Sequence, residues 1–197
     1  MKTVHSRFLL SALFICLFVS GHSQDSTMKV KTCEYRTDGK PGAYGLRLSF
    51  WVPCSWTKEE VANASILGNY SMMLPDSNSL SHTLTVNKME RPIPEEQLKG
   101  LFSTDGMKMI ARQMGKYVSG SKIQIGQWDA AEVRYWNQYK QSAGMMYSYG
   151  VQYYIPMNDK IITAIFVVSS LDKEKAKALF AQHELQFRTA AKSLLVR

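Results

Sequence analysis

The chain has 197 residues, 45% of them hydrophobic, and its 24 lysines and arginines outnumber the 16 aspartates and glutamates. This composition excludes wholesale disorder, which needs few apolar residues and a high net charge, and the length suits one domain with its own core. No block of lysine or arginine exceeds two residues, so the basic excess is scattered and we expect no nucleic-acid partner.

Residues 1–23 are predicted to form a secretory signal peptide. Lys2 and Arg7 precede an uncharged apolar run over residues 8–19, and small residues follow it. The run is shorter than the ~20 residues that a membrane-spanning helix needs. We therefore expect cleavage before Gln24, export to the periplasm or the exterior of a bacterium, and no transmembrane segment in the mature chain.

Two cysteines, Cys33 and Cys54, remain after cleavage. An even number of cysteines in an exported chain favours a disulfide, and closing a loop of about 20 residues would contribute ~3 kcal/mol to stability. Two buried free thiols are the alternative. Metal binding is disfavoured because the pair lacks the C-x-x-C spacing of common zinc sites.

The first half of the mature chain predicts a flexible lead-in over residues 24–31 and then mainly strands. Alternating apolar residues indicate strands, and proline, glycine and asparagine mark the turns between them. The predicted strands cover residues 32–36, 46–52 and 80–89. Residues 65–74 have a mixed pattern and are expected to form a hairpin with the last of these strands. A short helical turn is expected over residues 57–62, with Trp56 packed beneath it.

A mid-chain helix is predicted to begin at Pro94, where proline is tolerated and the following acidic residues suit the positive end of the helix dipole. It is expected to break at residues 103–106 and to resume through Tyr117. Strands follow at residues 123–125, 131–140, 145–155 and 161–168, the last continuously apolar as in a central strand covered on both faces. A helix over residues 172–196, with Ser169 and Ser170 as candidate caps, carries an apolar stripe.

These elements predict a single α+β domain over residues 32–197, in which a central antiparallel sheet is packed by the mid-chain helix and the C-terminal helix. The element order, together with the Phe-Trp-Val-Pro segment at residues 50–53 and Trp56 beyond it, resembles the PsbP-like (DcrB-like) family over residues 44–197. The resemblance implies a sheet with helices on both faces and a binding or accessory role, and it brings no universal catalytic residues. The cysteine pair departs from the family pattern.

Recognisable catalytic and metal-binding motifs are absent from the sequence. His82 and His183 occupy apolar faces of a predicted strand and helix, which favours core histidines over bases or ligands. Four carboxylates at or beside predicted turns are interpreted as solvated: Asp105, Asp129, Glu132 and Asp159. The methionines favour core packing over copper(I) binding. We expect no catalytic residue, no cofactor and no metal.

Aromatic residues are concentrated in the strands of the second half. If residues 131–140 pair with residues 145–155, one face of the sheet combines aromatic, amide and cationic side chains that could stack on sugars or contact a partner protein. The candidate binding residues are Arg134, Trp136, Gln138, Tyr147, Tyr149 and Tyr153. Cross-strand packing of the tyrosines is the structural alternative.

The leading hypothesis is an exported, non-enzymatic binding or accessory protein of the bacterial envelope, whose partner is a protein or an envelope or glycan component. The alternative is a periplasmic enzyme or metal-handling protein with a dispersed site. A deep pocket with converging His, Asp or Met side chains would favour this alternative, and an exposed aromatic face the leading hypothesis. A third hypothesis is association with anionic membranes through five basic residues of the last helix: Lys173, Lys175, Lys177, Arg188 and Lys192.

Overall fold

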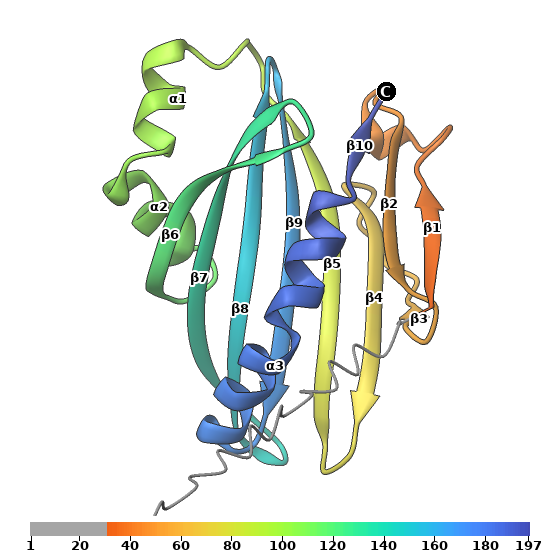
Figure 1. Cartoon of the computed structure of the whole chain (residues 1–197), viewed down its shortest axis with the longest axis vertical. Helices are drawn as coiled ribbons and strands as arrows, with labels where there is room; N and C mark the ends of the chain where they lie inside the picture. The colour runs from red at the N-terminus through yellow and green to blue at the C-terminus, as the bar shows by residue number, and fades with distance from the viewer. Residues whose placement is uncertain (1–30) are drawn as a thin grey trace, which may run out of the picture.

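The computed structural model describes residues 31–197, so the predicted signal peptide and most of the predicted lead-in lie outside the described residues. A seven-stranded sheet forms the centre, in the order β3-β4-β5-β9-β8-β7-β6, and all neighbouring strands are antiparallel (Figure 1). Its strands are β3 (Thr57–Lys58), β4 (Ile66–Leu74), β5 (Asn78–Lys88), β6 (Lys116–Ile125), β7 (Trp128–Gln141), β8 (Gly144–Met157) and β9 (Lys160–Ser170).

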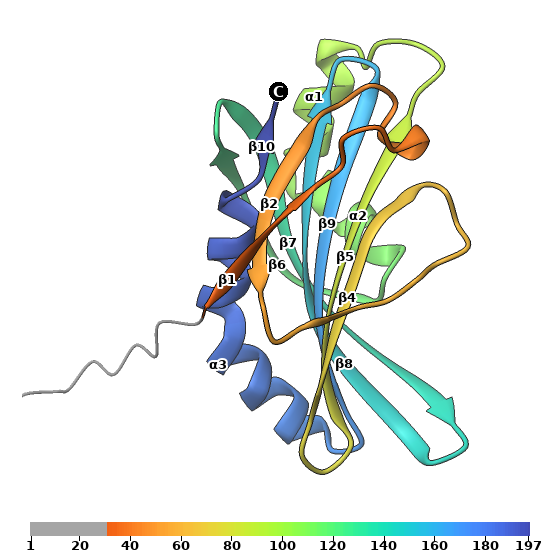
Figure 2. The ribbon, with the colours of Figure 1, turned by 90° about the vertical axis from the view of Figure 1, so that its right-hand side faces the viewer.

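A second, three-stranded sheet has the order β1-β2-β10, and its strand β2 packs against β4 and β5, where the Phe50 ring contacts those of Tyr70 and His82 (Figure 1). Its strands are β1 (Thr32–Arg36), β2 (Leu48–Pro53) and β10 (Leu195–Val196), and the 3-10 helix η1 (Pro41–Ala43) joins the first two (Figure 2). The predicted disulfide between Cys33 and Cys54 is present, with the two Cα atoms 5.0 Å apart. It ties β1 to the residue that follows β2.

Helices cover both faces of the large sheet, as the resemblance implied. α3 (Lys173–Lys192) shares one face with the small sheet, and α1 (Glu95–Leu101) and α2 (Thr104–Arg112) lie on the other (Figure 1). Phe187 of α3 stacks on Phe166 of β9, with ring centroids 5.2 Å apart. Burying each such side chain contributes roughly 1.5–3 kcal/mol, so this contact anchors α3 to the centre of the sheet.

The predicted α+β class, the antiparallel sheet and the central position of the apolar strand are confirmed. β9 lies between β5 and β8, and its residues 161–164 are all buried. The candidate caps of the last helix, Ser169 and Ser170, were wrong by three and two residues. Asp172 caps α3 by accepting a hydrogen bond from the Lys175 amide at 3.0 Å, while Ser170 Oγ accepts one from the Asp172 amide.

Three predicted elements differ from the structure because of strand pairing. Residues 57–62 form β3 and a loop instead of a helical turn, and Trp56 packs on α3. The mid-chain helix ends at Arg112 instead of continuing through Tyr117, because β6 pairs with β7 from Lys116 onward. Gly115, just before β6, passes so close to β7 that a Cβ on it would lie 2.4 Å from the Trp136 carbonyl oxygen. The last helix ends at Lys192 because β10 pairs with β2.

Candidate functional site

Four of the six predicted binding residues come together near the N-terminal end of α3. Trp136 lies opposite Tyr149, and Gln138 opposite Tyr147, in the β7–β8 ladder. The rings of Trp136 and Tyr149 stack with centroids 6.4 Å apart and an interplanar angle of 22°. Gln138 is exposed and the other three are half-buried, so this group is accessible at the surface.

Two lysines from other elements complete the surface. Lys116 begins β6 directly opposite Trp136, and Lys173 begins α3. Their Nζ atoms lie 4.9 Å and 4.8 Å from the centroid of the Trp136 ring, a cation–π arrangement. Sequence reasoning connected neither lysine with the aromatic residues, because neither belongs to the hairpin that carries them. We call the set of Lys116, Trp136, Gln138, Tyr147, Tyr149 and Lys173 the basic aromatic surface.

The charges of this surface are largely uncompensated. Among residues 31–197, neither Lys116 nor Lys173 forms an ion pair with a carboxylate. Glu174 is the neighbouring acidic group. Burial, with a smaller contribution from the Glu174 charge, raises the pKa of Tyr149, so its phenol stays neutral at physiological pH and can donate a hydrogen bond.

The remaining two predicted binding residues share this sheet face but lie beneath α3. Tyr153 is completely buried and packs edge-on against Phe166 at 6.0 Å. Arg134 is held in ion pairs with Glu132 and Glu184. Neither side chain is free to contact a partner, so we leave both out of the basic aromatic surface.

Glu132 is the centre of a charged cluster between α3 and β7, so its interpretation as a solvated turn residue was wrong. Its side chain is 1% exposed and accepts hydrogen bonds from Arg188 Nε and NH2 at 2.9 Å and 2.7 Å and from Arg134 NH2 at 2.8 Å. Burial alone would raise the pKa of Glu132, but the Arg188 hydrogen bonds and the two guanidinium charges outweigh it and lower the pKa. The cluster binds α3 to the sheet.

His82 is a core residue, as its position on an apolar strand face indicated. It lies on β5, 1% exposed, with its ring stacked 4.2 Å from that of Phe166. Burial lowers its pKa to about 3. His183 is half-buried on α3, and within the described part of the chain no three His, Cys, Asp or Glu side chains are grouped so that they could hold a metal ion.

An apolar cavity of about 510 Å³ lies between the α1–α2 pair and the sheet. Its lining combines aliphatic and methionine side chains with a few polar groups. Within residues 31–197 its only carboxylate is that of Asp105, which pairs with Lys108 at 3.2 Å. Residues that characterise it are Met89, Ile93, Leu101, Met109, Tyr154 and Ile161. We call it the helix-pair cavity. Sequence patterns gave no sign of it, because it depends on how far α1 stands from the sheet.

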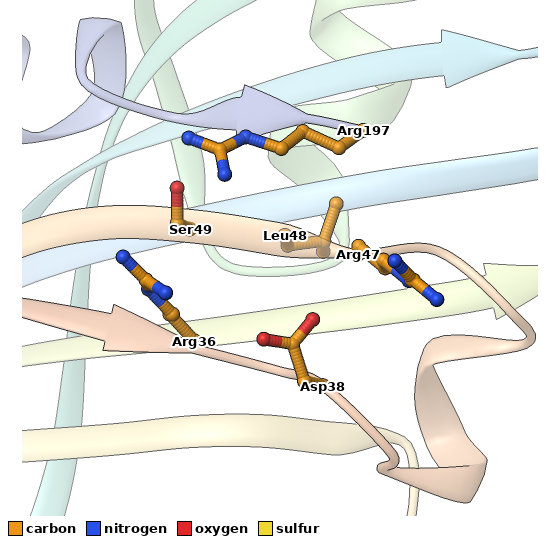
Figure 3. A pocket seen from close by; sticks show the side chains of 6 residues that line it. All are labelled: Arg36, Asp38, Arg47, Leu48, Ser49 and Arg197. Atoms are coloured by element: carbon orange, nitrogen blue, oxygen red, sulfur yellow. The ribbon is translucent and has the colours of Figure 1, made fainter.

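A smaller pocket of about 260 Å³ lies between β1, β2 and the residue after β10 (Figure 3). Figure 3 shows the guanidinium groups of Arg36 and Arg197 on either side of the Ser49 hydroxyl. Glu34 already supplies an anion here: it pairs with Arg36 at 2.8 Å, and this hydrogen bond, opposed by burial, lowers the pKa of its carboxyl. Arg36 is therefore already paired, whereas Arg47 and Arg197, which also line the pocket, form no ion pair among residues 31–197.

No protein-family model and no curated protein matches the sequence. Among solved structures, cyanobacterial PsbP (CyanoP) from Synechocystis sp. PCC 6803 is similar with a TM-score of 0.52 and 15% identity, over 85% of this chain and 94% of that one. This chain has the PsbP fold. The predicted resemblance is thus confirmed at the level of the fold, with the PsbP arrangement of an antiparallel sheet between helices.

Two other solved structures are similar with lower scores. LpqN of Mycobacterium tuberculosis, described as involved in cell envelope biogenesis, has a TM-score of 0.47 and 14% identity over 84% of this chain and 91% of that one. A protein of unknown function from Pseudomonas aeruginosa, described as a putative regulator, has a TM-score of 0.42 and 15% identity, over 84% of this chain and 97% of that one. In the part of the chain that the structure describes, no helix has the length and apolar character to cross a membrane.

Proposed function

We propose that this protein is an exported, non-enzymatic accessory protein of the bacterial envelope that binds an acidic partner protein through the basic aromatic surface. The observation that carries the proposal is the convergence of two ammonium groups, from Lys116 and Lys173, on the single ring of Trp136. Export rests on the leader-like residues 1–23 and is consistent with the disulfide, which persists in oxidising compartments.

The chemistry of the surface favours an acidic partner. Two like charges near one ring repel each other, and a carboxylate placed beside them would pair with both. Trp136, Tyr147 and Tyr149 would supply the apolar contact area that aromatic residues give to protein interfaces. Electrostatic attraction of this kind also speeds association, and added salt weakens it.

A glycan partner is less favoured by the same geometry. Sugars stack on an open aromatic face, whereas both lysine ammonium groups lie over the Trp136 ring within 5 Å of its centroid. A sugar would have to displace at least one of them and lose a cation–π contact of about 0.5–1 kcal/mol. Of the partners that the sequence suggested, a protein therefore suits this surface best.

The enzymatic and metal-handling alternative has weaker support. Two methionines, Met89 and Met109, line the helix-pair cavity, but its lining includes no histidine or cysteine within the described residues. The one carboxylate there is paired with Lys108. The membrane-surface alternative also loses two of its five basic residues, since Lys175 pairs with Asp76 and Arg188 with Glu132.

Charge reversal tests the proposed function. The protein would be purified from its native envelope with any bound partner, which mass spectrometry then identifies. We expect the double variant Lys116→Glu/Lys173→Glu to lose a partner that wild-type protein retains at low salt and releases at high salt. The control Lys177→Glu/Lys192→Glu changes the net charge equally at exposed sites on α3 and should retain it. A partner that stays bound to the first variant, or leaves both, contradicts the proposal.

A further inference from the structure

We propose that the helix-pair cavity binds the aliphatic chain of a single-chain lipid with an anionic head group. Residues of α1 and α2 line this site, and these helices lie on the sheet face opposite α3 (Figure 1). The site is independent of the proposed partner binding at the basic aromatic surface. Four features carry the inference: the unsupported position of α1, the rigid corner between α1 and α2, the aliphatic lining, and an unpaired arginine beside the cavity.

The first feature is that α1 stands away from the sheet. It contacts α2 and buries none of its own residues, and Figure 1 shows it projecting beyond the sheet. Its Leu101 lines the cavity and is only half-buried. Apolar side chains that face a gap gain stability when a ligand removes their surface from water, at roughly 25 cal/mol per Å².

The second feature is that the corner between the two helices is fixed. Ser103 Oγ donates a hydrogen bond to the Gly100 carbonyl oxygen at 2.6 Å and accepts one from the Gly106 amide at 3.1 Å. The helices approach so closely that a Cβ on Gly106 would lie 2.1 Å from the Gly100 oxygen. Because α2 is anchored to the sheet through buried Met107 and Ile110, α1 is held off the sheet and the cavity is preformed.

The third feature is the chemistry and size of the cavity. Apart from Tyr154 of β8, the apolar lining is aliphatic or methionine, and such flexible side chains adapt to a linear chain. Few aromatic rings are present to stack on a planar ligand. The volume of about 510 Å³ falls within the range of roughly 300–1,000 Å³ that is usual for small-molecule sites. These properties suit an extended aliphatic chain.

The fourth feature, an unpaired arginine, favours an anionic head group. A second cavity of about 260 Å³ adjoins the first and shares Met89, Ile93 and Gln97 with it. Arg91 lines this second cavity, and within residues 31–197 its guanidinium forms no ion pair; Glu90 beside it is likewise unpaired. A carboxylate or phosphate would match the arginine, while Gln97 can hydrogen-bond to the same group.

Calorimetric titration below the critical micelle concentration tests the site. The probes are laurate, lauroyl lysophosphatidic acid and the uncharged dodecyl maltoside. We expect saturable one-to-one binding of at least one anionic probe. Binding of laurate alone would indicate a free fatty acid as the ligand, and binding of lauroyl lysophosphatidic acid alone would indicate a phospholipid source. Arg91→Gln should weaken anionic probes about fivefold and leave the maltoside unchanged. Saturable binding by none of the probes overturns the proposal.

A carboxylate introduced into the cavity and its matched control locate the site. Leu101→Glu places a carboxylate in the cavity and should abolish binding, whereas Leu185→Glu adds the same charge at an exposed position on α3 and should leave binding intact. If Leu101→Glu fails to fold, methyl NMR of the wild type decides: laurate should shift Met89 and Met109 but not Met73, which is 71% exposed on β4. Equal binding by both glutamate variants, or laurate shifts at Met73 alone, overturns the proposal.

The same variants distinguish the site from a contact between copies of the chain. Sedimentation of the lipid-free protein should show the same oligomeric state for the wild type and Leu101→Glu. A wild-type dimer that Leu101→Glu dissociates, without lipid binding to either, would assign the cavity to self-association and overturn the lipid proposal. Neither result bears on the charge-reversal test of the basic aromatic surface.

Discussion

Mild acid should destabilise this protein through His82. The imidazole is 1% exposed, packed among the rings of Phe50, Tyr70 and Phe166, and burial lowers its pKa to about 3 from the ordinary value of 6.5. Below pH 6.5 the unfolded chain therefore binds a proton that the folded chain does not bind. The free energy of unfolding should fall as the pH decreases from 6.5 toward 3.

The size of the effect follows from the pKa difference. A difference of about 3.5 pKa units corresponds to a maximum loss of about 5 kcal/mol at 1.36 kcal/mol per unit. About 2 kcal/mol of this should be lost between pH 7 and pH 5. That window lies above the ordinary pKa of 4.5 for a glutamate such as Glu132, so His82 is separable from the carboxylates.

Urea unfolding at pH 7 and pH 5 measures this loss directly. His82→Phe keeps an aromatic ring in the cluster and removes the titrating group, so its stability should change little between the two pH values. His183→Gln is the matched control, because His183 is only half-buried, and it should retain the wild-type loss. If His82→Phe loses as much stability as the wild type between pH 7 and pH 5, the reasoning about His82 is refuted.

Three further predictions concern stability. Arg188→Met should lower the free energy of unfolding, measured with urea, by about 2 kcal/mol. This is less than the roughly 3–5 kcal/mol that breaking a buried ion pair usually costs, because the Arg188 side chain is 40% exposed. An unchanged free energy of unfolding would mean that the Glu132 cluster does not stabilise α3. Reducing the disulfide should cost about 3 kcal/mol in thermal unfolding, and an unchanged Tm contradicts this. Gly150→Ala should cost about 1–3 kcal/mol, since its Cβ would lie 2.5 Å from the Tyr135 hydroxyl; equal stability would show that Tyr135 moves freely.

Much of the fold could be predicted from the sequence because the strongest patterns are local. The apolar run at residues 161–168 identified the central strand, and the alternation at residues 80–89 identified β5, which is 78–88 in the structure. β6 was partly assigned to a helix because the apolar spacing continues through Tyr117. Pairing with β7 decides the conformation there, and sequence spacing carries no information about pairing between distant segments.

The candidate site could be predicted only in part, for a related reason. The aromatic residues of the hairpin are close in sequence, so their common face follows from the period-2 rule. Lys116 and Lys173 reach Trp136 from β6 and α3, and no local pattern connects them to it. Tyr153 has the same periodicity as Tyr149, yet α3 covers only Tyr153 completely. Helix placement therefore decides which residues of the face are accessible.

Photo-crosslinking in the native cell gives the most direct test of the central claim that the basic aromatic surface binds a protein. A benzophenone amino acid would replace Gln138 on this surface or, as the control, Leu185 on α3; both positions are exposed. We predict one discrete protein adduct from position 138 that disappears in the Lys116→Glu/Lys173→Glu background, and none from position 185. Absence of an adduct at position 138, or an adduct that survives the charge reversal, would contradict the account.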